Sequence, residues 1–130
     1  MKRSLKLNPD NRPATIKQIK TWRDFHETAP VGTTYGLMDC DEKADKRLAE
    51  QVEFFDHLSA FNEDGTLSWK MGDNSWRPFT HTELADAYQQ VRVNRAKRTG
   101  MLHLKAAEFE SMDPRPTVNE LKKLDRWLEQ

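Results

Sequence analysis

The chain has 130 residues, of which 36% are hydrophobic and 32% are charged, so its length fits one ordinary domain with a modest core. Its 21 Lys and Arg balance its 21 Asp and Glu, which excludes a global field drawing it toward nucleic acid or an anionic membrane. The single Cys40 excludes an internal disulfide framework, and no run approaches the roughly 20 apolar residues that cross a bilayer.

An extended arm is predicted over residues 1–14, which are polar and contain two prolines that disfavour helix. A helix is predicted over about 15–28. Thr15 and Gln18 have the spacing of a capping box, and apolar side chains follow at helical spacing: Ile16, Ile19, Trp22 and Phe25. Pro30 marks the end of this helix, and the glycine-containing stretch after it is expected to be a loop.

A second helix is predicted over about 40–59. Asp39 is its expected N-cap, with Glu42 three residues further on. One apolar stripe then runs along the helix through Ala44, Leu48, Val52, Phe55 and Leu58.

A β-hairpin is predicted over about 66–79, where apolar and polar residues alternate before and after a turn. Residues 72–74 include Gly, Asp and Asn, which tolerate the positive φ of a tight turn. Pro78 limits the second strand to an edge position. The large side chains of Trp69, Trp76 and Phe79 are expected to pack the hairpin against a helix, and one of the indoles is an alternative contact for a partner.

A long helix is predicted over about 81–111. Thr80 and Glu83 form a capping box, while Phe79 and Leu84 have the spacing of a hydrophobic staple. Gly100 is expected to bend or interrupt this helix.

A last helix is predicted over about 118–129, because two prolines end the preceding one and Thr117 with Glu120 forms a third capping box. The fold class is therefore mainly α with one small β-hairpin, an α+β arrangement. Its expected parts are the arm at 1–14, a helical domain at 15–112, and a C-terminal helix at 113–130 that docks on a partner.

Metal and catalytic motifs are weak. Asp39, Asp41, Asp45 and Glu50 imitate the register of a calcium loop, but Lys43 stands at a ligand position and Ala44 replaces the required glycine. The four histidines (His26, His57, His81 and His103) have no paired spacing for zinc. A hydrolase using Cys40 with one of these histidines remains a minor hypothesis. We expect no enzyme, no metal, no cofactor and no catalytic residue.

The basic cluster of Arg92, Arg95, Lys97 and Arg98 lies within the long predicted helix and spreads around much of its circumference. A solvated or partner-facing surface is the favoured interpretation, and nucleic-acid binding is not expected. The alternative function is a small phage-encoded regulator that binds a host protein or nucleic acid through this cluster.

The segment from Trp69 through Asp73, Asn74 and Trp76 to Glu83-Leu84 resembles a domain of unknown function found in tail-fibre and fibre-associated proteins of tailed phages. The shared pattern is a Trp, an Asp-Asn turn, an aromatic residue and a Thr-capped helix, and the likeness extends over about residues 61–112. Residues 1–40 and 113–130 resemble no known family.

This resemblance implies a phage tail context and a structural or assembly role, and it supplies no catalytic residues. We therefore expect a non-catalytic protein that works by protein–protein packing, either in the phage virion or in the host cytoplasm during assembly. Its expected partners are other tail or virion proteins, with a homo- or hetero-oligomer as the product and no membrane contact. The expected contact residues are Ile16, Ile19, Trp22, Arg95, Arg98, Leu124, Trp127 and Leu128.

Overall fold

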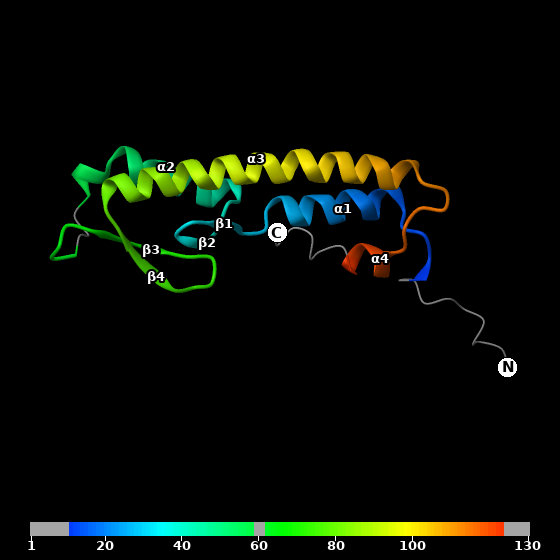
Figure 1. The fold of residues 1–130 in the computed structure, drawn as a ribbon, viewed down its shortest axis with the longest axis horizontal. Coiled ribbons are helices and arrows are strands. Elements are labelled where there is room, and N and C mark those ends of the chain that lie inside the picture. The colour runs from blue at the N-terminus through cyan, green and yellow to red at the C-terminus, as the bar shows by residue number, and fades with distance from the viewer. Residues whose placement is uncertain (1–10, 59–61, 124–130) are drawn as a thin grey trace. The chain divides into compact units, whose positions relative to one another are not determined.

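A computed structural model describes residues 11–58 and 62–123 of the chain (Figure 1). The chain is mainly helical with short antiparallel strands, which confirms the predicted α+β fold class. In chain order the elements are α1 (Ile16–Glu27), β1 (Val31–Thr33), β2 (Gly36–Met38), α2 (Glu42–Glu53), the 3-10 helix η3 (Phe55–His57), β3 (Leu67–Lys70), β4 (Trp76–Phe79), α3 (His81–Ser111) and α4 (Val118–Lys123).

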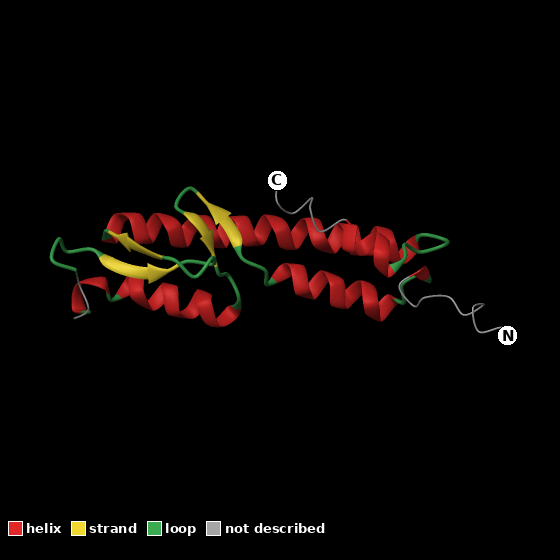
Figure 2. Cartoon of the chain, turned by 90° about the horizontal axis from the view of Figure 1, so that it is seen from below, coloured by secondary structure: helices red, strands yellow, loops and turns green. Residues whose placement is uncertain are grey.

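Two separate two-stranded sheets are present among the described residues (Figure 2). Strands β3 and β4 form the predicted hairpin, with Leu67 opposite Phe79, and its turn uses Asn74 at a φ of 71°. Strands β1 and β2 form a second hairpin, with Val31 opposite Met38, where the sequence analysis expected only a loop. Three-residue strands are too short to show the alternation that identifies a strand from sequence.

Helix α3 runs from His81 to Ser111 without interruption, so its predicted bounds are confirmed and the expected break at Gly100 is wrong. Helix α2 is shorter than predicted because Asp41, not Asp39, is its N-cap: the Asp41 carboxylate accepts a hydrogen bond from the Ala44 amide at 2.8 Å. Phe54 ends α2, and η3 replaces the last predicted turn. Helix α4 begins as predicted, and the expected remainder lies beyond residue 123, outside the described residues.

The described chain divides into two compact units. The central unit is Thr28–Lys97, and the terminal unit comprises the chain up to Glu27 and from Arg98 onward. Each has its own core. The core of the central unit includes Val31, Met38, Cys40, Leu48, Phe55, Leu67, Met71, Phe79, Leu84, Ala87 and Val91. The core of the terminal unit includes Ala14, Ile19, Trp22, Leu102, Ala106, Phe109 and Leu121.

The terminal unit joins the two ends of the described chain. The Ala14 amide donates to the Pro116 carbonyl at 2.8 Å, and the Arg115 Nε donates to the Ala14 carbonyl at 2.8 Å. Pro13 pairs with Thr117 in an isolated antiparallel bridge. The described part of the predicted arm therefore lies along the segment that leads into α4.

Candidate functional site

One face of α3 carries apolar and small side chains into solvent. Residues that recur every three or four positions share one side of a helix. On α3 this row is exposed throughout, and we call it the α3 outer face: Gln89, Val93, Ala96, Gly100, Leu104, Ala107 and Ser111.

Large apolar side chains on and beside this face are unusually exposed. Leu104 is 76% exposed and Val93 is 43% exposed, and Met101 at the edge of the face is 51% exposed. The opposite side of the same helix holds the buried residues of the cores, among them Val91 and Leu102. Helix α3 is thus apolar on two opposite sides, and only one of them is covered by the described chain.

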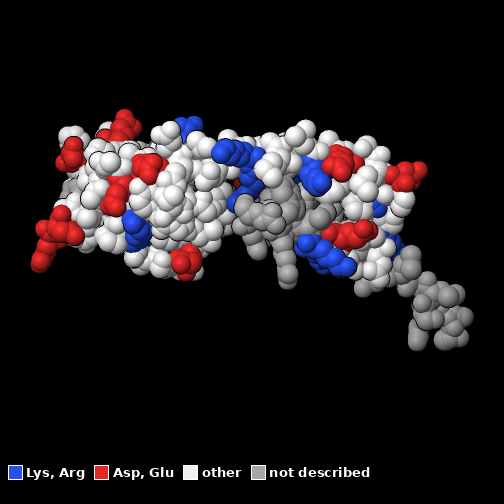
Figure 3. All heavy atoms as spheres, in the orientation of Figure 1, with Lys and Arg blue, Asp and Glu red and all other residues white. Residues whose placement is uncertain are grey.

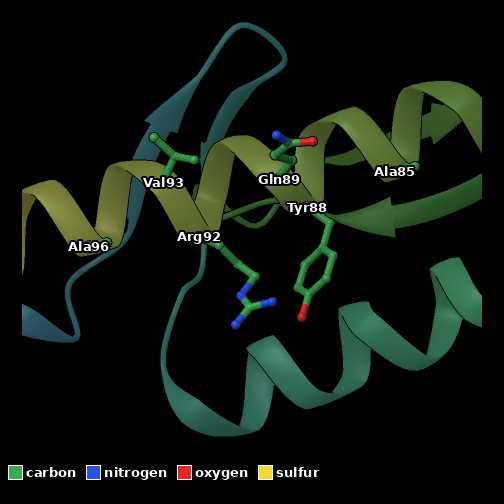
Figure 4. A pocket seen from close by; sticks show the side chains of 6 residues that line it. All are labelled: Ala85, Tyr88, Gln89, Arg92, Val93 and Ala96. Carbon is green, nitrogen blue, oxygen red and sulfur yellow. The ribbon is translucent and has the colours of Figure 1, made fainter.

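A hollow of about 520 Å³ lies along the first half of α3 in the central unit (Figure 4). Six residues of α3 line it: Ala85, Tyr88, Gln89, Arg92, Val93 and Ala96.

The side chains of Tyr88 and Arg92 form one wall of the hollow, and both point toward α2 in Figure 4. The Arg92 guanidinium carbon lies 5.5 Å from the centre of the Tyr88 ring, and its Nε lies 4.0 Å from the Asp45 Oδ1. The hollow contains amide, guanidinium and apolar groups, a lining suited to the side chains of another protein.

Polar contacts attach the β1–β2 hairpin to α3 within the central unit. The Tyr35 hydroxyl donates to the Asp86 carboxylate at 2.7 Å, and this hydrogen bond is the main reason that the pKa of Tyr35 lies above its usual value of 10.0. The Asn94 side chain donates to the Gly32 carbonyl at 2.8 Å. The Arg77 guanidinium also lies over the Tyr35 ring, 4.8 Å from its centre.

The predicted contact residues of α1 are mostly internal. Ile19 is fully buried, and Trp22 packs edge-on against Phe109, with the ring centres 5.5 Å apart. Only Ile16 is substantially exposed, at 38%. The structure therefore places Ile19 and Trp22 in the core of their own unit. The remaining apolar candidates, Leu124, Trp127 and Leu128, lie outside the described residues.

The four basic residues of α3 do not share one surface. Arg95 and Arg98 are half-buried, and Arg98 donates to the His26 carbonyl at 3.1 Å. Arg92 lies near Asp45 instead, while Lys97 is exposed. On the face shown in Figure 3, the basic and acidic side chains of the described residues form small groups separated by uncharged surface.

Cys40 is fully buried in the central unit, where its thiol donates to the Ala29 carbonyl at 3.0 Å. Three of the four histidines have clear structural contacts, and the first of them, His26, is buried with its ring edge-on to Trp22, ring centres 5.4 Å apart. His81 stacks on Phe55, with ring centres 4.7 Å apart, and His103 lies 3.0 Å from the Glu27 carboxylate. Over residues 11–58 and 62–123, no three His, Cys, Asp or Glu side chains are grouped so that they could hold a metal ion.

The α3 outer face was not predicted from sequence, where the basic cluster was the only part of this helix interpreted as partner-facing. Leu84, Val91 and Leu102 recur at helical spacing and form the buried side of α3. The signal available in the sequence was a second row of apolar and small residues at the same spacing, half a helical turn away from the buried row. Within the described residues no helix meets the length and apolarity that crossing a bilayer demands.

These features define a small, mainly helical α+β module with one exposed apolar helix face. Residues 10–99 match the model of a family described as Domain of unknown function (DUF4376). Since the match covers more than half of the chain, the protein belongs to this family. Searches among curated proteins and among solved structures returned no match.

Proposed function

We propose that this chain is a non-catalytic structural or assembly protein of a bacteriophage tail, which acts by packing against other proteins. The observation that carries the proposal is the α3 outer face. Exposed apolar groups such as Leu104 and Met101 contribute no stability to the chain that bears them, whereas burial against a partner contributes about 25 cal/mol per Å².

The phage context is supported by the resemblance of the hairpin and the start of α3 to tail-fibre-associated proteins. The residues of that resemblance have clear structural roles here: Asn74 forms the turn, and Phe79 is fully buried ahead of the Thr80 cap. The shared pattern therefore describes a folding unit, the hairpin with its following helix, and carries no set of reactive groups. This agrees with a structural role better than with a chemical one.

The partners in this proposal are other tail or virion proteins, and the product is a homo- or hetero-oligomer located in the virion or, during assembly, in the host cytoplasm. Regulation through the basic cluster is not proposed, because Arg95 and Arg98 are half-buried and Arg98 donates to the His26 carbonyl, so the four basic side chains do not form one exposed surface. Nucleic acid and membranes have no role in the proposed activity.

Quantitative mass spectrometry of purified phage particles and of tail-assembly intermediates tests the proposal. We expect peptides of this chain in a fixed ratio to a known tail protein in at least one of these fractions. Its absence from both would contradict the proposal. In the same assay Leu104→Glu, which places a charge on the α3 outer face, is expected to lower incorporation, while Thr82→Glu at the exposed start of α3 serves as the control.

A further inference from the structure

Gly100 lies in the interior of α3, where glycine is among the least favourable residues for a helix. Nothing in the described chain requires it. Its φ is not in the left-handed region, and a Cβ atom built on it would meet no atom within 4 Å. A glycine in a helix interior allows another backbone or a large side chain to approach closely, and no part of residues 11–58 and 62–123 approaches Gly100 in this way.

We propose that the α3 outer face pairs with the same face of a second copy of this chain, with the two α3 helices antiparallel. This inference rests on the proposed function and names one partner for it. The residues concerned belong to a single uninterrupted helix, so their row follows from helical geometry alone.

Side-chain sizes limit the register of the pair. A two-fold axis level with residue 102 brings Leu104 of each copy over Gly100 of the other, so that the most exposed apolar side chain fills the gap left by the missing side chain. The same register places Val93 opposite Ser111, and it brings Ala96 within one residue of the level of Ala107 of the partner. The two large apolar residues of the face, Leu104 and Val93, therefore each meet a small residue of the partner.

The charges at the edges of the face agree with this register. An antiparallel two-fold pair brings each edge of a helix against the same edge of its partner, with the direction reversed. One edge of α3 carries Arg92 and Glu110, and the other carries Lys97 and Glu108. Each edge therefore pairs a cation with an anion of the second copy. Parallel pairing would instead bring Glu108 beside Glu110 of the partner and Leu104 against Leu104.

The overlap from Val93 to Ser111 is about 27 Å long, at about 1.5 Å per residue. A contact between two helices of this length is at the small end of specific interfaces, so the dimer is expected to dissociate on dilution. Sedimentation velocity of the full chain over a roughly hundredfold range of concentration is the direct test. A monomer at every concentration overturns the proposal, and the mass spectrometry of particles still decides the proposed function separately.

Gly100→Leu tests the close approach. The added side chain blocks the space that Leu104 of the partner occupies, so we expect at least a tenfold rise in the dissociation constant. Leu also favours helix more than Gly does, so the Tm of the dilute monomer should not fall, which separates this effect from misfolding. Thr82→Leu is the matched control, because Thr82 is exposed on the same side of α3 but lies outside the overlap. Unchanged or tighter association of Gly100→Leu overturns the proposal.

A charge exchange tests the antiparallel direction. We expect Lys97→Glu and Glu108→Lys each to weaken the dimer severalfold, and the double variant to recover most of that loss, since opposite charges then face each other again. In a parallel pair these two residues are more than two helical turns apart, and the double variant would recover nothing. Failure of this recovery overturns the antiparallel register.

Discussion

Among the residues that the structure describes, three threonines begin helices, and each forms a reciprocal pair of hydrogen bonds with the residue three positions later. The Thr15 hydroxyl accepts from the Gln18 amide at 3.1 Å while the Gln18 side chain accepts from the Thr15 amide at 2.9 Å. Thr80 with Glu83 and Thr117 with Glu120 repeat the same pair. All three capping boxes predicted from sequence are therefore confirmed, because the motif is entirely local and needs no knowledge of the tertiary fold.

Of the three caps, the one at Thr80 should affect stability most, because Thr80 begins α3, the helix that contributes residues to both cores. We expect Thr80→Ala to lower the free energy of unfolding by about 1 kcal/mol, the usual loss for an N-cap. Urea unfolding measures it. Thr82→Ala changes the same residue type two positions later, where no cap bond exists, and should be close to neutral. Equal losses in the two variants would argue against the capping role.

Asp73 stabilises the turn between β3 and β4 in its charged form. Its carboxylate accepts hydrogen bonds from the Ser75 hydroxyl at 2.5 Å and the Ser75 amide at 2.9 Å, and the hydroxyl bond is the larger cause that lowers the pKa of Asp73 below its usual value of 3.8. A depressed pKa means that the folded chain binds this proton less readily than the unfolded chain. The contribution to stability is therefore complete above pH 3.8 and is lost as the pH falls through the lower folded value.

Asp73→Ala should accordingly be less stable than the natural chain at neutral pH, with a difference that narrows as the pH falls below about 4. Thermal unfolding at a series of pH values measures the difference. Glu63→Ala removes an exposed acidic side chain from a neighbouring turn and controls for the change in net charge. If the difference in stability between Asp73→Ala and the natural chain stays constant down to the lowest pH measured, the turn does not depend on the ionised carboxylate.

At the scale of elements, the β1–β2 hairpin depends on α3 more than on its own strands. A three-residue pair is marginal alone, and Gln90 of α3 attaches it through Thr34: the Thr34 amide donates to the Gln90 side chain at 2.8 Å, and the Gln90 amide group donates to the Thr34 hydroxyl at 2.9 Å. A third bond joins Gln90 to Asp86 at 3.0 Å.

Removal of this attachment by Gln90→Ala is expected to lower the free energy of unfolding by roughly 1–2 kcal/mol, as a few partly exposed hydrogen bonds are lost. Amide hydrogen exchange should become faster in β1 and β2 and stay unchanged in β3 and β4. Gln89→Ala is the control at the adjacent position, since the Gln89 side chain lies on the α3 outer face. Equal exchange in both hairpins after Gln90→Ala would contradict this role.

Elements with strong local signals were predicted well, and those set by tertiary contacts were not. The capping box at Thr80 correctly predicted where α3 begins, and Pro114 just beyond the helix correctly predicted where it ends. The β1–β2 hairpin was missed because its stability comes from Gln90, which is more than fifty residues away in the sequence. At α2, two aspartates two residues apart both fit a cap, and only the structure shows that Asp41 is used.

The candidate site was harder to predict than the fold, for a physical reason. A helix with apolar residues on two sides gives two periodic rows, and sequence cannot tell which row the chain covers. Leu104 of α3 was not predicted for this reason, whereas Ile19 and Trp22 of α1 were predicted as contacts because sequence does not show that distant residues such as Phe109 cover them. Trp76 is 66% exposed rather than packed on a helix, whereas Phe79 is fully buried as expected.

At the scale of the whole molecule, two cores share one helix. Leu102 belongs to the core of the terminal unit and Phe79 to that of the central unit, and each is almost completely buried. Large-to-small substitutions at such positions remove about 2–5 kcal/mol. The effects should be local to each unit, because the two sets of core residues do not overlap.

We expect Leu102→Ala to accelerate amide hydrogen exchange mainly in α1 and α4, and Phe79→Ala to accelerate it mainly in the two hairpins and α2. Mass spectrometry of exchanged peptides measures both patterns in the full chain. Leu104→Ala, two residues from Leu102 but exposed, is the control and should leave exchange in the dilute monomer unchanged. Identical patterns for Leu102→Ala and Phe79→Ala would mean that the units unfold only together.

The connectivity of the units also sets an order during translation. The central unit is contiguous in sequence, whereas the terminal unit needs α1 to meet residues made about seventy positions later, from Arg98 onward. Each emerging chain must therefore carry the apolar side of α1, with Ile19 and Trp22, uncovered while the rest is synthesised. For that interval the nascent polypeptide presents these side chains to chaperones, so α1 is open to misfolding until the segment from Arg98 onward has been made.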